Sequence, residues 1–183
     1  MISKFIFTKI FGWKFNGEFP KELKKYVLIG APHTSWKDFL VGLFSKNSTN
    51  TKLNFVGKKA LFKPPFGWFF KALGGTPIDR TKSTNVVDAI IEVFNAKEEF
   101  RLAISPEGTR QFVEKWKTGF YYIAQGANVP IIMLGFDFEN KEVKLSKPFY
   151  TTGDIKADFE HFYQFYKNIK GENPELFNNK SFI

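Results

Sequence analysis

The stretch YVLIGAPHTSWKD, residues 26–38, passes directly from an apolar run into a polar cluster. Residues 26–29 predict a buried strand, and the Gly, Ala and Pro at residues 30–32 predict the turn that ends it. A helix should follow, because Thr34 or Ser35 can cap its first turn. The face with which this helix should pack on a sheet consists of Phe39, Leu40, Leu43 and Phe44. A strand that passes into a helix in this way is the repeating unit of α/β proteins.

The same unit recurs along the rest of the chain. Further strands are expected at residues 53–56, 74–78, 100–104, 129–136 and 143–150, each a short apolar run between turn signals. Helices should lie over residues 83–94, 120–127 and 154–169, with Ser83 and Asp154 as N-caps. This alternation predicts one α/β domain with a mainly parallel or mixed central sheet flanked by helices.

The composition fits one globular domain with a basic surface. The 183 residues carry a net charge of +9, and 43% of them are hydrophobic. Cysteine is absent, which excludes disulfide scaffolds, thiolate metal sites and thiol nucleophiles. The chain also has 24 Phe, 6 Tyr and 4 Trp, more rings than one small core needs. A basic, aromatic-rich protein binds either nucleic acid or an anionic membrane face, and charge alone does not choose between them.

The first 13 residues, MISKFIFTKIFGW, have the character of an interfacial anchor. On an ideal helix Lys4 and Thr8 fall on one side, whereas Phe5, Ile6 and Ile10 fall on the other. A packing helix or strand explains these residues equally well. No stretch approaches the roughly 20 apolar residues of a spanning helix, so any membrane association should be peripheral. We expect a single domain over residues 1–183, in which residues 1–25 form an amphipathic, membrane-contacting lead segment.

A second aromatic and basic segment covers residues 58–71, KKALFKPPFGWFFK. Two prolines and a glycine interrupt it, so it cannot form an ordinary core helix. Rings beside lysines suit the boundary between lipid headgroups and acyl chains. Stacking on nucleic-acid bases and burial against the N-terminal segment are the alternatives. The residues predicted to contact membrane or acyl chain are Phe62, Phe66, Trp68, Phe69 and Phe70.

His33 stands where the first strand passes into its helix, five residues before Asp38. One helical turn can bring the Asp38 carboxylate back to the imidazole, where it would fix the tautomer and leave the other nitrogen free as a base. No nucleophilic side chain accompanies this pair, which suits a reaction in which the hydroxyl of the substrate attacks. A surface histidine beside a capping serine is the alternative.

The loop after the strand at residues 100–104 has the sequence SPEGTR, residues 105–110. Gly108 permits a tight loop with exposed backbone N–H groups, and Arg110 adds a guanidinium, so the loop can cradle an anion. Arg80 lies just after another expected strand and can supply a second guanidinium for a phosphate or carboxylate. Simple ion pairs would explain each arginine separately.

Together these blocks resemble the lysophospholipid (glycerolipid) acyltransferase family, of which the bacterial 1-acylglycerol-3-phosphate acyltransferases are the best-known type. The resemblance covers most of the chain, and the blocks follow one another in the order and spacing of the family. They are residues 12–13 (GW), 32–38 (PHTSWKD), 57–59 (GKK), 65–68 (PFGW), 74–80 (GGTPIDR), 105–110 (SPEGTR), 116–119 (WKTG) and 129–131 (VPI).

The resemblance implies roles for the residues of two of these blocks. His33 would be the general base, with Asp38 as its orienting partner. The acceptor headgroup site would consist of Arg80, Glu107, Gly108, Thr109 and Arg110. A carboxylate would repel a phosphate, so Glu107 is expected to organise the loop or to pair with Arg110 instead of touching the headgroup.

The resemblance also implies substrates and a location. A fatty acyl group would move from acyl-CoA or acyl carrier protein to the free hydroxyl of a lysophosphatidate-like lysolipid, with no metal or bound cofactor. The protein would act peripherally at the anionic surface on the cytoplasmic face of the inner membrane, and it would not bind nucleic acid. Pro32 and Ser105 stand where the family often has Asn and Phe, so a lyso-aminolipid is an alternative acceptor. A non-catalytic lipid- or nucleic-acid-binding protein is the alternative function.

Overall fold

The computed structural model describes residues 2–78 and 86–183. Its strands are β1 (Lys14–Asn16), β2 (Lys25–Ala31), β3 (Phe55–Lys58), β4 (Gly75–Ile78), β5 (Phe100–Ile104), β6 (Ile131–Asp137) and β7 (Glu142–Leu145). Its helices are α1 (Ile2–Phe5), η1 (Ile6–Ile10), α2 (Lys37–Thr49), η2 (Lys59–Phe62), α3 (Gly67–Ala72), α4 (Val86–Ala96), α5 (Gly119–Gly126), α6 (Ile155–Tyr166) and η3 (Pro174–Leu176). Strands and helices alternate, as the sequence predicts.

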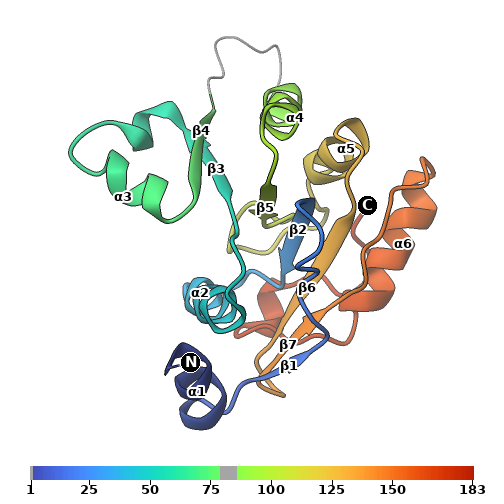
Figure 1. Ribbon diagram of the computed structural model, residues 1–183. Coiled ribbons are helices and arrows are strands. Elements are labelled where there is room, and N and C mark those ends of the chain that lie inside the picture. Colours follow the sequence, from blue (N-terminus) through green and yellow to red (C-terminus); the bar gives the residue numbers. More distant parts are fainter. Residues whose placement is uncertain (1, 79–85) are drawn as a thin grey trace.

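The main sheet has five strands in the order β1-β7-β6-β2-β5. Neighbouring strands run parallel except β6 and β7, which are antiparallel, so the sheet is mixed (Figure 1). The prediction of an α/β domain with a mainly parallel or mixed sheet is confirmed. Because β2 and β5 pair in parallel, the loops that follow them leave the same edge of the sheet, where α/β proteins place their sites.

Alternate residues of the central strands face two separate cores. Val27 and Ile29 of β2 face a core that α4, α5 and α6 cover, whereas Tyr26 and Leu28 face a core that η1 and α2 cover. This two-residue period is what a strand buried on both faces requires. The sheet is therefore shielded on both sides, and its loop edge is left to form a site.

A smaller sheet of β3 and β4 forms a lobe together with η2 and α3 (Figure 1). Inside the lobe Phe62 packs edge to face on Phe70, with ring centroids 6.3 Å apart. A bridge between Asn54 and Leu102 of β5 joins the start of the lobe to the main sheet. The strands predicted at residues 53–56 and 74–78 are thus present, but they pair with each other outside the main sheet.

The predicted packing face of α2 is wrong in part, although Phe44 is partly buried against the core that η1 covers. Asp38, Val41 and Ser45 are buried, whereas Phe39 is 57% exposed. The rotation follows from Asp38, which must face inward to reach the loop that carries His33. Val41 and Ser45, three and seven residues after Asp38, then face inward with it. Trp36 occupies the N-cap position without a side-chain cap bond, although the Ser35 hydroxyl accepts a bond from Lys37 N–H at 3.2 Å.

The structure differs from the predicted elements in three further ways. Strand β1 has no counterpart among the predicted strands, and β7 is shorter than residues 143–150. The N-terminal helix continues as a π-helix, in which Phe11 N–H donates to Ile6 O at 3.0 Å. The wider turn changes the helical faces, so Phe7 is buried while Phe5 and Ile10 are exposed. In contrast, the predicted N-cap of α6 is confirmed, because the Asp154 side chain accepts the backbone N–H groups of Lys156 and Ala157.

Candidate active site

The loops after β2 and β5 line an open cavity of about 570 Å³ at the edge of the main sheet. Its lining combines the predicted base with the predicted anion-binding loop: His33, Ile104, Ser105, Gly108, Thr109, Arg110 and Gln111. These residues are far apart in the sequence, and the parallel pairing of β2 with β5 brings them together. Arg80 and Ser83 lie outside the described residues.

His33 and Asp38 form a close pair at this cavity. Nδ1 of His33 lies 3.2 Å from Oδ2 of Asp38, and the His33 side chain keeps about a quarter of its surface exposed. A carboxylate at Nδ1 holds the proton there, so Nε2 carries the free lone pair. The pair is therefore arranged as an oriented base at the wall of a cavity.

Asp38 is held by the backbone of the loop that precedes it. Its Oδ2 accepts the N–H of Thr34 at 2.8 Å and the N–H of Ser35 at 2.9 Å, in addition to the contact with His33. The other oxygen, Oδ1, is buried and has no hydrogen-bond partner within the described residues. Among the described residues, Oδ2 alone therefore makes the polar contacts that position this carboxylate.

Glu107 lies behind the cavity and is almost fully buried. Its Oε2 accepts the backbone N–H of His33 at 2.8 Å and the hydroxyl of Ser105 at 3.4 Å. Burial, reinforced by the negative charge of Asp38, raises the pKa of Glu107 to about 8, although the hydrogen bonds act in the opposite direction. At neutral pH this side chain is mostly protonated and does not repel an anion. Within the described residues it forms no ion pair with Arg110.

The loop after Glu107 presents positive charge. Gly108 has a φ of +69°, which only glycine adopts readily, and a Cβ there would lie 2.7 Å from Nζ of Lys117. The Lys117 side chain therefore passes directly over the loop, while its backbone N–H donates to Pro106 O at 2.9 Å. Arg110 is exposed at the cavity, and neither it nor Lys117 forms an ion pair within the described residues.

Three residues near the site were not predicted as site residues. Ser105 appeared in the sequence as the first residue of the 105–110 loop and as a departure from the family pattern, and Lys117 only as a member of a block. Asn173 gave no signal, because it lies far along the chain in a polar stretch, yet it bonds to the loop that carries His33. Contacts of this kind depend on chain segments that meet only in the folded protein.

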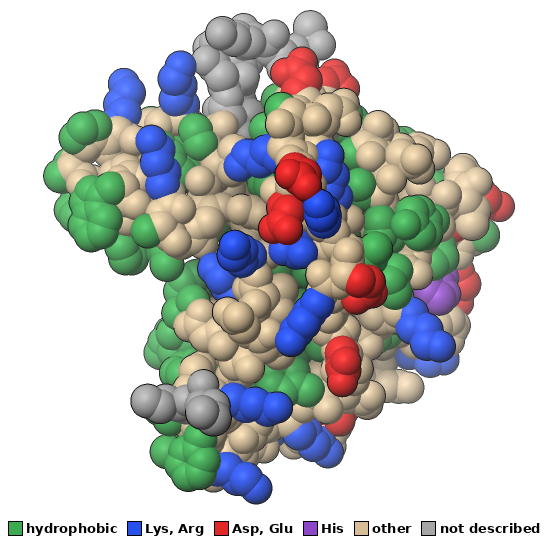
Figure 2. Space-filling view, viewed as in Figure 1, with side chains coloured by type: hydrophobic (Ala, Val, Ile, Leu, Met, Phe, Trp, Pro, Cys, Tyr) green, Lys and Arg blue, Asp and Glu red, His purple; other side chains and the backbone are tan. Residues whose placement is uncertain are grey.

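The five aromatic residues predicted to contact membrane or acyl chain fall into two groups by their exposure. Phe66, Trp68 and Phe69 are exposed, with Trp68 at 72%, whereas Phe62 and Phe70 are half-buried in the lobe. Figure 2 shows hydrophobic side chains on this lobe and further down the same edge of the molecule, with lysines and arginines between them. Phe39 and Leu40 of α2 and Phe5 and Ile10 of the N-terminal segment are also exposed.

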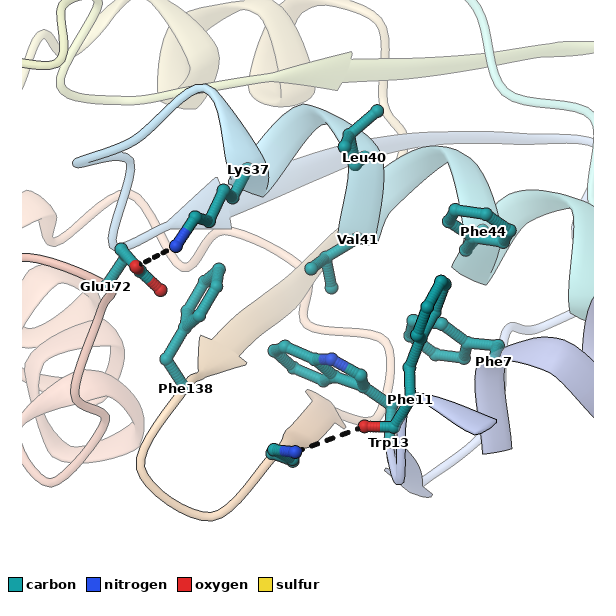
Figure 3. Close-up of a pocket in the computed structure, with 10 residues that line it drawn as sticks. Phe7, Phe11, Trp13, Lys37, Leu40, Val41, Phe44, Phe138 and Glu172 are labelled. Carbon is teal, nitrogen blue, oxygen red and sulfur yellow. Dashed lines mark hydrogen bonds and ion pairs between the residues drawn. The ribbon is translucent and has the colours of Figure 1, made fainter. Parts of the chain in front are cut away.

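A second cavity, of about 320 Å³, lies between the N-terminal segment and α2. Figure 3 shows Phe7, Phe11, Trp13 and Phe44 around it, and an ion pair between Lys37 and Glu172 at one end. Val41 and Leu40 complete the wall on α2. None of the five aromatic residues predicted to contact membrane or acyl chain lines this apolar cavity.

Comparisons with known proteins find relatives that share one name. The chain is 30% identical to a 1-acyl-sn-glycerol-3-phosphate acyltransferase of Saccharomyces cerevisiae over 128 residues, which are 65% of this chain and 41% of that protein. It is 35% identical to the Escherichia coli protein of the same name over 98 residues, 50% of this chain and 40% of that one. A Streptococcus pneumoniae protein of that name is 31% identical over 130 residues, 66% of this chain and 47% of that one. The chain thus matches less than half the length of each relative.

The fold also resembles a solved structure. The crystal structure of the 1-acyl-sn-glycerophosphate acyltransferase PlsC from Thermotoga maritima matches with a TM-score of 0.53 and 19% identity, over 87% of this chain and 73% of that one. At this identity the likeness concerns the fold alone. The sequence profile of the acyltransferase family matches residues 14–136, which include both β2 and β5 and the loops that follow them. The chain therefore belongs to the acyltransferase family.

Proposed function

We propose that this protein is an O-acyltransferase that moves a fatty acyl group from acyl-CoA or acyl carrier protein to the free hydroxyl of a lysophosphatidate-like lysolipid. The observation that carries the proposal is the pair of His33 and Asp38 at a cavity that Arg110 also lines. The similarity to proteins named 1-acyl-sn-glycerol-3-phosphate acyltransferase supports the reaction class and the acceptor.

In the proposed reaction, His33 acts as the general base. Its Nε2 takes the proton from the acceptor hydroxyl while that oxygen attacks the thioester carbonyl, and the buried Asp38 stabilises the imidazolium that forms. The tetrahedral intermediate then collapses, the carbon–sulfur bond breaks, and the imidazolium returns the proton to the leaving thiolate. No covalent intermediate on the protein is required, so the reaction needs no nucleophilic side chain.

The loop after β5 is proposed to bind the acceptor headgroup. Arg110 and Lys117 supply positive charge, Gly108 and Thr109 bring the backbone close, and a protonated Glu107 adds no repulsion at neutral pH. We include Arg80 in this site on the family resemblance. A lyso-aminolipid whose headgroup carries a carboxylate satisfies the same cations, and it stays the alternative acceptor.

The acyl chain of one substrate is proposed to occupy the apolar cavity beside α2. Val41 in its wall lies one helical turn after Asp38, so the cavity and the proposed base share a helix. Its volume of about 320 Å³ falls at the lower end of the range of small-molecule pockets. Its ring-lined wall matches a hydrocarbon chain in polarity.

We propose that the protein works at an anionic membrane surface, on the cytoplasmic face of the inner membrane. The exposed rings of α3 stand among lysines, and the net charge is +9. Residues 1–25 are proposed as a second contact, since Phe5, Ile10 and Phe11 are exposed there. Within residues 2–78 and 86–183, no helix is both long and apolar enough to span a membrane.

Acyl transfer to a panel of lysolipids tests the proposed function. Purified protein is supplied with long-chain acyl-CoA or acyl carrier protein and with lysophosphatidate, a neutral lysolipid or a lyso-aminolipid, and product formation is compared with that of His33→Ala. We expect turnover with lysophosphatidate, and its loss in a folded variant. Transfer to the lyso-aminolipid alone would change the acceptor. Liposome binding without any transfer would favour the non-catalytic lipid-binding alternative.

A further inference from the structure

We propose that Asn173, in the segment that follows α6, is a positioning residue that holds the loop of His33 in its working geometry. The inference deepens the proposed function and rests on it, because it assigns His33 the role of base. Asn173 lies beyond residues 14–136, the part of the chain that the acyltransferase profile matches. It does not reach the cavity, and its effect runs through the backbone of Thr34.

Asn173 makes two hydrogen bonds to the same residue of the loop. Its side-chain Nδ2 donates to the carbonyl oxygen of Thr34 at 2.8 Å, and its backbone N–H donates to the Thr34 hydroxyl at 3.1 Å. Thr34 is almost fully buried, so water does not readily replace these bonds. The loop that carries the proposed base is thereby tied to a residue 139 positions away.

The Thr34 carbonyl belongs to the same peptide group as the N–H of Ser35. The carbonyl end is held by Asn173, and the N–H end is held by Oδ2 of Asp38 at 2.9 Å. Because a peptide group is planar, any rotation of it moves both ends together. Asn173 therefore fixes the direction of a hydrogen bond that positions Asp38, which in turn contacts Nδ1 of His33.

Two backbone N–H groups and the contact with His33 are the polar contacts that hold the Asp38 carboxylate within the described residues. Its Oδ1 has no hydrogen-bond partner within the described residues, so the N–H groups of Thr34 and Ser35 carry its orientation. A loop free to rotate the Thr34–Ser35 peptide would weaken this support. The imidazole of His33 would then lose the partner that selects the tautomer with the proton on Nδ1.

The segment that carries Asn173 is itself firmly placed. A Cβ on Gly171 would lie 2.9 Å from both Pro32 Cβ and the Thr34 hydroxyl, so this backbone touches the loop directly. Glu172 forms an ion pair with Lys37 at the start of α2. Phe138 N–H donates to Lys170 O at 2.8 Å, which joins the segment to the end of β6. Asn173 therefore acts from a supported position and can hold the loop in place.

Two substitutions of Asn173 separate positioning from a general effect on folding. Asn173→Ala removes the amide donor, and Asn173→Leu removes it while keeping a similar side-chain volume. The matched control is Asn178→Ala, because Asn178 lies in the same C-terminal segment and its amide donates to the carbonyl oxygens of Glu114 and Ser181. Measurements are kcat, both KM values, the melting temperature and the tautomer of His33 from imidazole nitrogen chemical shifts.

We expect both Asn173 variants to lower kcat about threefold to tenfold, while both KM values stay within about twofold. The His33 signal should move toward the tautomer with the proton on Nε2. The signal of His161, which stacks on Phe149 in a different part of the molecule, should stay unchanged. The Asn178 variant should match the wild type in kcat and in both histidine signals.

The proposal is overturned if either folded Asn173 variant keeps the wild-type kcat and His33 tautomer, or if Asn178→Ala produces the same losses. The nuclear magnetic resonance measurement needs no substrate. If the wild type transfers no acyl group, the proposed function fails, yet a change of the His33 tautomer in the Asn173 variants would still establish that Asn173 positions this histidine.

Discussion

At the scale of single residues, the site depends on the hydrogen bonds that two buried carboxyl groups, those of Asp38 and Glu107, receive. Asp38 is buried but receives two backbone N–H bonds and the His33 contact on one oxygen. Glu107 is buried with one backbone N–H and one distant hydroxyl, and its pKa rises to about 8. The spacing of His33 and Asp38 predicts the first arrangement from the sequence. Burial of Glu107 is a tertiary property, and no sequence pattern indicated it.

Replacement of Asp38 by Asn should lower kcat by about a hundredfold or more, with KM values little changed. The Asn oxygen can still accept the N–H bonds of Thr34 and Ser35, but the side chain no longer carries the charge that stabilises an imidazolium. Initial rates with saturating substrates measure this loss, and thermal melting checks that the variant folds. A variant with more than a tenth of the wild-type kcat would contradict the role assigned to Asp38.

The raised pKa of Glu107 predicts a pH dependence of stability. Between pH 4.5 and about 8 the folded protein keeps a proton that the unfolded chain has released, so the unfolding free energy falls as the pH rises through this range. Thermal melts of the wild type and of Glu107→Gln at pH 5 and pH 8.5 measure the effect. The wild type should lose more stability than the variant over this interval, and parallel losses would contradict the raised pKa.

At the scale of elements, α2 links the proposed chemistry to the proposed substrate. It buries Asp38 near His33, places Val41 and Leu40 at the apolar cavity and leaves Phe39 exposed. Apolar periodicity predicted the helix here but placed Phe39 and Leu40 on its packing face, although both are exposed. The periodicity counts only hydrophobic residues, whereas the buried polar Asp38 decides how this helix is rotated on the sheet.

Replacement of Leu40 by Trp should shorten the preferred acyl chain. Leu40 lines the apolar cavity, and the larger ring would fill part of its volume. We expect the preference for hexadecanoyl over decanoyl donors or acceptors to fall about tenfold or more. Competition assays with mixed chain lengths measure this preference. Phe39→Trp is the matched control, because Phe39 is the preceding residue and lies outside the cavity lining; an equal shift in both variants would contradict the proposed chain site.

At the scale of the whole molecule, the fold separates two kinds of aromatic side chain. Rings such as Phe120 and Phe162 fill the core between sheet and helices, whereas those of Phe66, Trp68 and Phe69 stand exposed on the lobe. The surplus of aromatic residues in the composition is explained in part by these exposed rings. A surface of rings and lysines is chemically matched to the interface of an anionic bilayer.

Replacement of Phe66, Trp68 and Phe69 by Ser should reduce binding to vesicles that contain anionic lipid by about tenfold or more. Flotation of the protein with such vesicles measures the bound fraction. The control variant replaces Tyr122 and Tyr150, which are exposed aromatic residues outside the α3 lobe, and should bind as the wild type does. Unchanged flotation of the α3 variant would contradict the proposed membrane contact.

The sequence by itself determined the α/β class, most strands and helices, and the pairing of His33 with Asp38, because each depends on periodicity or spacing within a few residues. Only the tertiary structure decided the rotation of α2, the charge state of Glu107 and the contact of Asn173 with Thr34. Burial and hydrogen bonding between distant segments control these features. They arise when parallel strands and the C-terminal segment converge on one edge of the sheet.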